Sequence, residues 1–163
     1  CAATISVFEN TAKVDSVMAL RSLYIESYNV LAMIKTNVEV FKDQIAAFTE
    51  FLVQTTPDKN QSRDIDYLLA LGEIFTLVAY GQLILESKEF FDIEDDLMDE
   101  IFDFMVRDFS KYALQVFCKP SSTSRQKDLC RKMMKSPVPD EDKFERIWKN
   151  CVYPLKGQYT MNP

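Results

Sequence analysis

The chain has 163 residues, a length at which a single domain can bury a hydrophobic core without cross-links. Hydrophobic residues make up 47% of it, charged residues 27%, and the formal net charge is -6, so the protein has no general attraction for nucleic acid. It contains no histidine, which excludes Ser-His and Cys-His nucleophiles and removes the commonest metal ligand. With three glycines and six prolines, the chain has little material for the turns of an all-β fold, and we expect helices.

A nearly unbroken heptad pattern over residues 15–53 predicts a long first helix, preceded by an N-terminal linker over residues 1–14. The two sets of heptad positions hold Val17, Tyr24, Leu31, Val38, Ile45 and Leu52, and Leu20, Ser27, Ile34, Phe41 and Phe48. The pattern allows a break near Ser27–Asn29 or near Thr36–Asn37, but its unchanged register favours one continuous helix. Pro57 ends this helix, because the residue before a proline avoids the α region.

The stretch Tyr67–Leu85, within a longer run from Asp64 to Glu89, is apolar nearly all the way round and predicts a central buried helix. Asp64 is a suitable N-cap for it. We expect Glu73 to be its buried ionisable group, held by a partner. Gly72 and Gly81 each cost roughly 1 kcal/mol in a helix interior, so we expect neighbouring helices to approach closely there.

The same stretch approaches the length of a transmembrane helix, which needs about 17 to 25 apolar residues. Glu73 would then lie inside the apolar layer, and no basic cluster flanks the stretch. Both features argue against a membrane span.

A third helix is predicted from about Asp95 to Phe117. Its expected apolar stripe holds Leu97, Ile101, Phe104, Met105, Phe109, Tyr112 and Val116. Acidic residues dominate the run from Asp92 to Asp108, where they suit the positive end of the helix dipole. A di-iron site would need Glu-x-x-His pairs, so we interpret the run as a solvated helix start.

Thr123 and Gln126 form a possible capping box for a fourth helix that extends to about Lys135. A last short helix is expected from about Asp140 to Val152, followed by an extended tail, Pro154–Pro163. It carries apolar residues at helical spacing, namely Phe144, Ile147, Trp148 and Cys151. The prediction is an all-α, up-down bundle of four main helices with a short C-terminal helix, forming one domain over residues 15–163.

Basic residues outnumber acidic ones from Lys111 to Lys135, and the fourth helix is the most basic part of the chain. Its basic side chains are a candidate contact surface for anionic lipid, a phosphate-bearing cofactor tail or an acidic partner. The residues are Arg125, Lys127, Arg131, Lys132 and Lys135. The alternative is that they neutralise the acid-rich run within the fold or across a dimer. No residue is predicted to be catalytic, cofactor-binding or metal-ligating.

The cysteines Cys1, Cys118, Cys130 and Cys151 match no metal-binding spacing. They suit either free thiols in a cytosolic protein or two disulfides in a secreted one. The first ten residues lack the basic region and apolar core of a signal peptide, so we expect a cytoplasmic protein, with a peripheral membrane location as the variant of this expectation.

Several stretches resemble the C-terminal helical domain of bacterial, extended acyl-CoA dehydrogenases, a resemblance that covers most of the chain from Asp15 onward. The stretches are Asp66–Glu73, Val78–Gly81, Arg107–Leu114, Lys119–Ser122, Phe144–Trp148, Tyr153, Leu155–Gly157 and Tyr159–Pro163. These are packing and turn residues rather than a catalytic signature.

The resemblance implies a parent enzyme that uses FAD and a carboxylate base to remove two hydrogens from an acyl-CoA. None of that apparatus falls on this chain, which is expected to bind no cofactor and to be inactive alone. Its implied partners are the catalytic core, in the same or a separate polypeptide, further copies of itself, and a membrane surface. The alternative is a secreted four-helix signalling protein of the cytokine kind, which the long first helix, the four cysteines and the sequon Asn60–Ser62 would permit.

Overall fold

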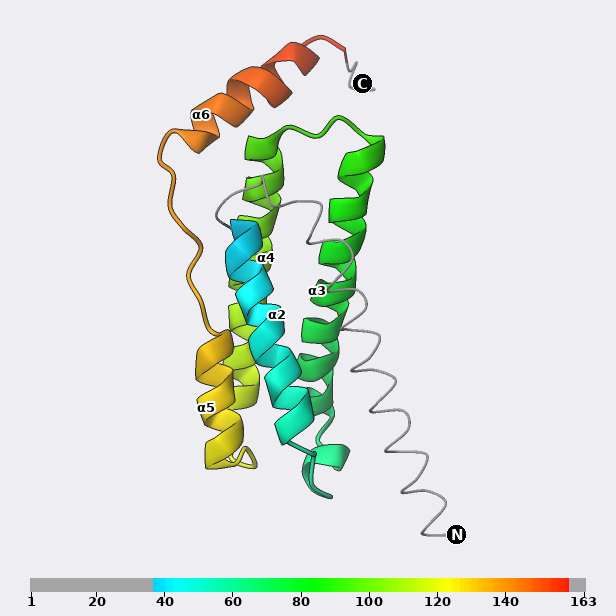
Figure 1. Ribbon diagram of the computed structural model, residues 1–163, viewed down its shortest axis with the longest axis vertical. Helices are drawn as coiled ribbons and strands as arrows, with labels where there is room; N and C mark the ends of the chain where they lie inside the picture. Colours follow the sequence, from blue (N-terminus) through cyan, green and yellow to red (C-terminus); the bar gives the residue numbers. More distant parts are fainter. Residues whose placement is uncertain (1–36, 159–163) are drawn as a thin grey trace, which may run out of the picture.

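The structure, a computed structural model, describes residues 37–158, which form helices and turns without any β-strand (Figure 1). The long helices are α2 (Asn37–Gln54), α3 (Ile65–Phe90) and α4 (Asp95–Cys118), which run alternately down and up the bundle. The shorter α5 (Ser124–Met133) lies beside α2 and α4, and α6 (Lys143–Ile147) crosses the opposite end. The predicted all-α bundle is confirmed. The linker and the heptad positions before Asn37 lie outside the described residues.

Helix α4, rather than α3, is the central helix of the described bundle. It packs against α2, α3, α5 and α6, whereas α3 packs mainly on α4. The expectation that Tyr67–Leu85 is the central buried helix is therefore wrong for residues 37–158. An apolar composition shows that a helix needs cover, but it does not show how many neighbours surround it.

The buried face of α4 also differs from the predicted stripe. It comprises Met98, Phe102, Met105, Val106, Phe109, Ala113 and Val116. Phe104, which the stripe included, is exposed, and the Arg107 guanidinium carbon lies 4.5 Å from its ring centroid. Because helices cover α4 from several sides, its buried face is wider than one stripe and is rotated from it.

A cluster of phenylalanines at the centre of the core explains one of the glycines in α3. The ring of Phe41 meets those of Phe102 and Phe109 edge-on, at centroid distances of 5.3 and 5.7 Å. A Cβ at Gly81 would lie 2.7 Å from Phe41 Cε1, so only glycine allows α2 to approach α3 here. The close approach expected at Gly81 is confirmed. At Gly72, a Cβ would meet nothing within 4 Å among the described atoms.

The outward face of α3 is exposed in the described bundle, and Glu73 lies on it. The expectation of a buried Glu73 is therefore wrong. The face is nevertheless rich in large apolar side chains, namely Ile65, Leu68, Leu69, Phe75, Tyr80, Leu83 and Phe90.

One described helix is long and apolar enough to cross a membrane by length and composition, the stretch Ile65–Lys88 of α3, with a mean hydropathy of 1.8. Core helices of soluble proteins satisfy the same criterion. In α3 the charged Asp66, Glu73 and Glu86 lie on the exposed side, where lipid contact would be costly.

The helix boundaries follow local signals. Asp64 Oδ1 accepts a hydrogen bond from the N–H of Tyr67, and Thr123 with Gln126 forms a reciprocal capping box, so both predicted caps are confirmed. At the C-terminal end, α6 begins at Lys143 and continues as a π-helical turn, Trp148–Val152. A 3-10 turn follows at Tyr153–Leu155, so the start of the expected extended tail is instead a turn.

Gln44 joins α5 to the rest of the bundle. Its side chain is fully buried, and Nε2 donates to the carbonyl oxygens of Met133 and Val106 at 2.8 and 3.1 Å. The Met133 carbonyl belongs to the last residue of α5, where helices leave carbonyls without an intrahelical donor. Gln44 of α2 thus donates a hydrogen bond to a carbonyl oxygen at the C-terminal end of α5 that has no donor within its own helix.

Candidate functional site

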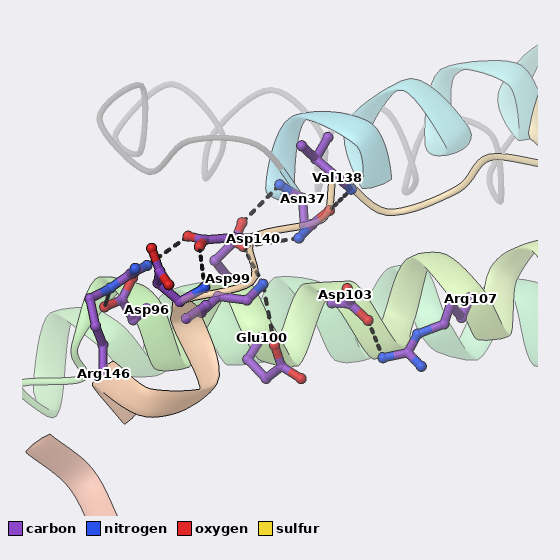
Figure 2. A network of polar contacts seen from close by, with 11 residues as sticks. Asn37, Asp96, Asp99, Glu100, Asp103, Arg107, Val138, Asp140 and Arg146 are labelled. Atoms are coloured by element: carbon purple, nitrogen blue, oxygen red, sulfur yellow. Dashed lines mark hydrogen bonds and ion pairs between the residues drawn. The ribbon is translucent and has the colours of Figure 1, made fainter. Parts of the chain in front are cut away.

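Polar contacts join the starts of α2 and α4 to the segment that leads into α6 (Figure 2). Asp99 lies at the centre: Oδ1 accepts from the N–H of Asn37 at 2.9 Å, and Oδ2 accepts from Asn37 Nδ2 at 2.9 Å. The ammonium of Lys143 lies 2.7 Å from Asp99 Oδ2 and 3.2 Å from Glu100 Oε2. The Lys143 and Asp99 side chains are only 5% and 14% exposed, so this is a largely buried ion pair.

Burial opposes the charged form of Lys143, but its hydrogen bonds to Asp99 and Glu100 outweigh that effect, and its pKa is raised. The Lys143 ammonium therefore keeps its charge at neutral pH. Asn37 extends the contact, because its Oδ1 accepts from the N–H of Val138 at 2.8 Å. The segment between α5 and α6 is thereby attached to the start of α2.

Arg146 forms a second, more exposed ion pair with the same end of α4. Its Nε and Nη2 donate to the two carboxylate oxygens of Asp96 at 2.7 and 2.9 Å, and Nη2 also donates to Asp140 Oδ2 at 2.7 Å. These bonds lower the pKa of Asp96 and of Asp140 and raise that of Arg146. We call this group the α6 clamp. Its members are Asn37, Asp96, Asp99, Glu100, Asp140, Lys143 and Arg146.

The clamp gives a structural role to part of the acid-rich run that the sequence analysis interpreted as a solvated helix start. Asp96, Asp99 and Glu100 are three and four residues apart, so they share one face of α4. Lys143 and Arg146 have the matching spacing on α6. Complementary charges at helical spacing in both segments are the signal that sequence reasoning missed.

The clamp attaches α6 to the bundle, while Phe144 of α6 and Trp148 of the following π-helical turn remain exposed. Phe144 and Trp148 are 72% and 53% exposed, and their rings stack with centroids 6.2 Å apart. They line an open hollow in the surface together with Asp142, Glu145, Arg146 and Lys149. We call this surface the Phe144–Trp148 face.

Three of the predicted basic contact residues form ion pairs within the described bundle. Lys132 and Arg125 both meet Glu50 of α2, at 2.8 and 3.5 Å, and Arg131 pairs with Asp128 in its own helix. The hydrogen bond from Lys132 is the largest influence on Glu50 and lowers its pKa. The partners are thus acids of α2 and α5 and not the acid-rich run of α4.

The remaining two, Lys127 and Lys135, have no ion-pair partner among residues 37–158. Four of the basic residues lie on α5, at the other end of the bundle from α6 (Figure 1), and Lys135 lies two residues after the end of α5. Its role as a contact surface stays a prediction.

The described cysteines are free: Cys118 is exposed, Cys151 half-buried and Cys130 buried. Burial raises the pKa of Cys130 to about 12, so this thiol stays protonated and packs as a small apolar group. No three cysteine or acidic side chains within residues 37–158 are grouped as metal ligands. The disulfides of the secreted alternative find no support among these three cysteines, and Cys1 lies outside the described residues.

No protein-family model, curated protein or solved structure matches the chain. The resemblance described above therefore remains an expectation. The two features that point outward from the described bundle are the Phe144–Trp148 face and the apolar face of α3.

Proposed function

We propose that this chain is a non-catalytic helical domain that docks on the catalytic core of an FAD-dependent acyl-CoA dehydrogenase, in the same or a separate polypeptide. The docking surface is the Phe144–Trp148 face. The domain acts in packing on the core and in oligomerisation, while FAD and the acyl-CoA pocket belong to the core.

The exposed, stacked pair of Phe144 and Trp148 is the observation that carries this proposal. Both residues belong to a stretch on which the resemblance rests, and neither contributes to the core of the described bundle. Aromatic side chains, tryptophan above all, are enriched at the energetic centres of protein interfaces. Contiguous exposed apolar surface can mark an interaction site, and the stacked rings of Phe144 and Trp148 form one continuous surface.

The rigidity of the face supports the same proposal. A short helix with few contacts would lose conformational freedom on binding, which weakens association. The buried Lys143–Asp99 pair and the bidentate Arg146–Asp96 pair fix α6 on α4 in advance. The segment that carries Phe144 and Trp148 is therefore already ordered before binding, so it loses less conformational entropy when a partner binds.

The basic group on α5 is a separate contact in this proposal. Helix α5 lies at the opposite end of the bundle from α6 (Figure 1), so its basic side chains are available to an acidic protein surface or to anionic lipid while the Phe144–Trp148 face is covered. Lys127 and Lys135 are its best candidates, since Arg125, Arg131 and Lys132 already meet acidic groups.

Tryptophan fluorescence offers a direct test, because Trp148 is the only tryptophan of the chain. The purified chain is titrated with the FAD-containing core of an extended acyl-CoA dehydrogenase from which the helical domain has been removed. Binding should quench Trp148 emission, because the indole ring becomes buried at the interface and lies closer to the flavin of the core. The variant Phe144→Ser should weaken the complex at least about tenfold, which corresponds to about 1.4 kcal/mol.

The control is Leu114→Ser, which removes a similarly exposed apolar side chain from α4 and should leave the dissociation constant unchanged. Absence of a complex at about 100 μM, or equal weakening by both variants, would contradict the proposal. The isolated chain should be colourless, and a stoichiometric flavin absorbance band would show that the cofactor had been assigned to the wrong polypeptide.

A further inference from the structure

The apolar face of α3 leaves one side of the described bundle uncovered. Large apolar side chains follow it from Ile65 to Leu83, a distance of about 27 Å along a helix. At its middle lies Gly72, where a Cβ would meet nothing within 4 Å among the described atoms. An apolar helix face of this size is normally buried against another helix, a partner protein or lipid.

The backbone N–H of Asn37, the first residue of α2, forms a hydrogen bond to another helix. The N–H of Asn37 donates to Asp99 Oδ1, a side-chain atom of α4, at 2.9 Å, whereas an N–H inside a helix points along the axis to the carbonyl four residues earlier. Asn37 therefore has the open N–H of a first helical turn. This position coincides with Thr36–Asn37, one of the two breaks that the heptad pattern allows.

The position of Asn37 along the axis of α3 follows from the contact between Phe41 and Gly81. Phe41 packs directly against Gly81, so Asn37, one turn earlier in the antiparallel α2, is level with about Leu85 near the end of α3. A segment that turns back here would descend along α3 towards Ile65.

We propose that residues 15–36 form a helix that packs on the exposed face of α3 and completes a four-helix bundle with α2, α3 and α4. The apolar heptad positions from Val17 to Ile34 would span about 26 Å as a helix, which matches the length of the face. The same heptad register is inward-facing in α2, where Val38, Phe41, Ile45 and Phe48 are buried.

The positions of Arg21 and Glu73 support this alignment of residues 15–36 with α3. Allowing about three residues for the turn, Arg21 falls within about one helical turn of Glu73. Arg21 flanks the apolar heptad positions, where interhelical ion pairs usually form, and Glu73 lies on the exposed side of α3. Leu20 and Tyr24 would meet the surface around Gly72 and Thr76, where small side chains allow two helices to approach.

Disulfide trapping in the full chain tests the packing. In a background of Cys1→Ser, Cys118→Ser and Cys151→Ser, Thr76→Cys is combined separately with Leu20→Cys and with Tyr24→Cys. The buried Cys130 is retained. Mild oxidation should form an intramolecular disulfide in at least one pair, seen as a two-hydrogen mass loss and a faster monomer band on a non-reducing gel. The matched control pairs Thr76→Cys with Ser22→Cys, at the same height on the polar side of the segment, and should cross-link at least about tenfold more slowly.

Three results would overturn the proposal. A covalent dimer formed by the protein carrying Thr76→Cys alone would identify a second copy as the cover of α3. A bimane label at this cysteine that shifts to shorter wavelength only when phosphatidylcholine vesicles are added would identify lipid. Equal cross-linking of the Ser22 control, or none in any pair, would show that residues 15–36 do not pack there. As a control, circular dichroism of each variant tests whether the helices are retained.

Discussion

At the residue scale, Asp99 combines more structural roles than any other side chain in the clamp. Its two oxygens satisfy the N–H and amide of Asn37 and neutralise Lys143. A buried ion pair contributes modestly as a pair, but removing one partner leaves an uncompensated charge inside the protein. The consequence is that Asp99 cannot be replaced without also affecting Lys143.

Replacing Asp99 by alanine should lower the free energy of unfolding by about 3 kcal/mol, because the Lys143 ammonium loses its main partner. Urea denaturation followed by circular dichroism measures this. Asp108→Ala, which removes an exposed acid from the same helix, should change the value by less than about 0.5 kcal/mol. Adding Lys143→Met to Asp99→Ala should recover part of the loss, and the absence of any recovery would mean that Lys143 is not the destabilised group.

At the element scale, α3 has two different faces despite its nearly uniform composition. Its buried face meets α4 and the Phe41 ring, and contains Gly81 where the rings approach. Its other face is exposed among the described residues and carries Glu73. Apolar residues occur on both faces, so the composition of the helix does not decide which face is buried. The neighbouring helices decide it.

Gly81→Ala should lower the free energy of unfolding by about 1 to 2 kcal/mol, because overpacking the core costs more than the gain in helix propensity. The added methyl would lie 2.7 Å from Phe41 Cε1. In a Phe41→Leu background the same substitution should cost less, since the smaller side chain leaves room. Equal costs in both backgrounds, measured as a double-mutant cycle by urea denaturation, would exclude the Phe41 contact as the cause.

At the scale of the whole molecule, α6 is joined to the bundle mainly through charged groups, so its attachment should depend on pH. The pKa values of Asp96 and Asp140 lie below the ordinary 3.8, chiefly because Arg146 donates to both. A lowered folded-state pKa adds stability that is complete above the unfolded-state value and is lost as pH falls through the folded-state value. Lys143, whose pKa is raised above 10.5, adds stability that is lost only in strong alkali.

The anisotropy of Trp148 fluorescence should therefore fall as the pH drops below about 3.8, while helix content changes little until lower pH. Circular dichroism measured in parallel reports on α2, α3 and α4. In Asp96→Asn the acid-dependent fall should be smaller and the anisotropy at neutral pH already reduced. If both signals change together in the unmodified chain, the clamp does not release separately from the bundle.

Much of the secondary structure could be predicted because its signals are local. Asp64 caps α3, Thr123 and Gln126 cap α5, and α4 begins at Asp95, as the sequence analysis expected. Side chains a few residues apart determine these features. Helix α6 begins at Lys143, three residues after the expected Asp140, and its N-cap residue Asp142 forms no side-chain cap hydrogen bond.

The sequence by itself determined that the protein is all-α, where most of its helices begin and end, and that α3 needs apolar neighbours. Only the tertiary structure decided that α4 is the central helix among residues 37–158, that Glu73 is exposed among these residues, and that the acidic start of α4 holds Lys143 and Arg146. The contacts responsible join residues far apart in the chain, with separations of 44 for Lys143 and Asp99 and 62 for Asn37 and Asp99. Helical periodicity and capping are short-range properties of the chain, whereas the choice of partners depends on how whole helices pack.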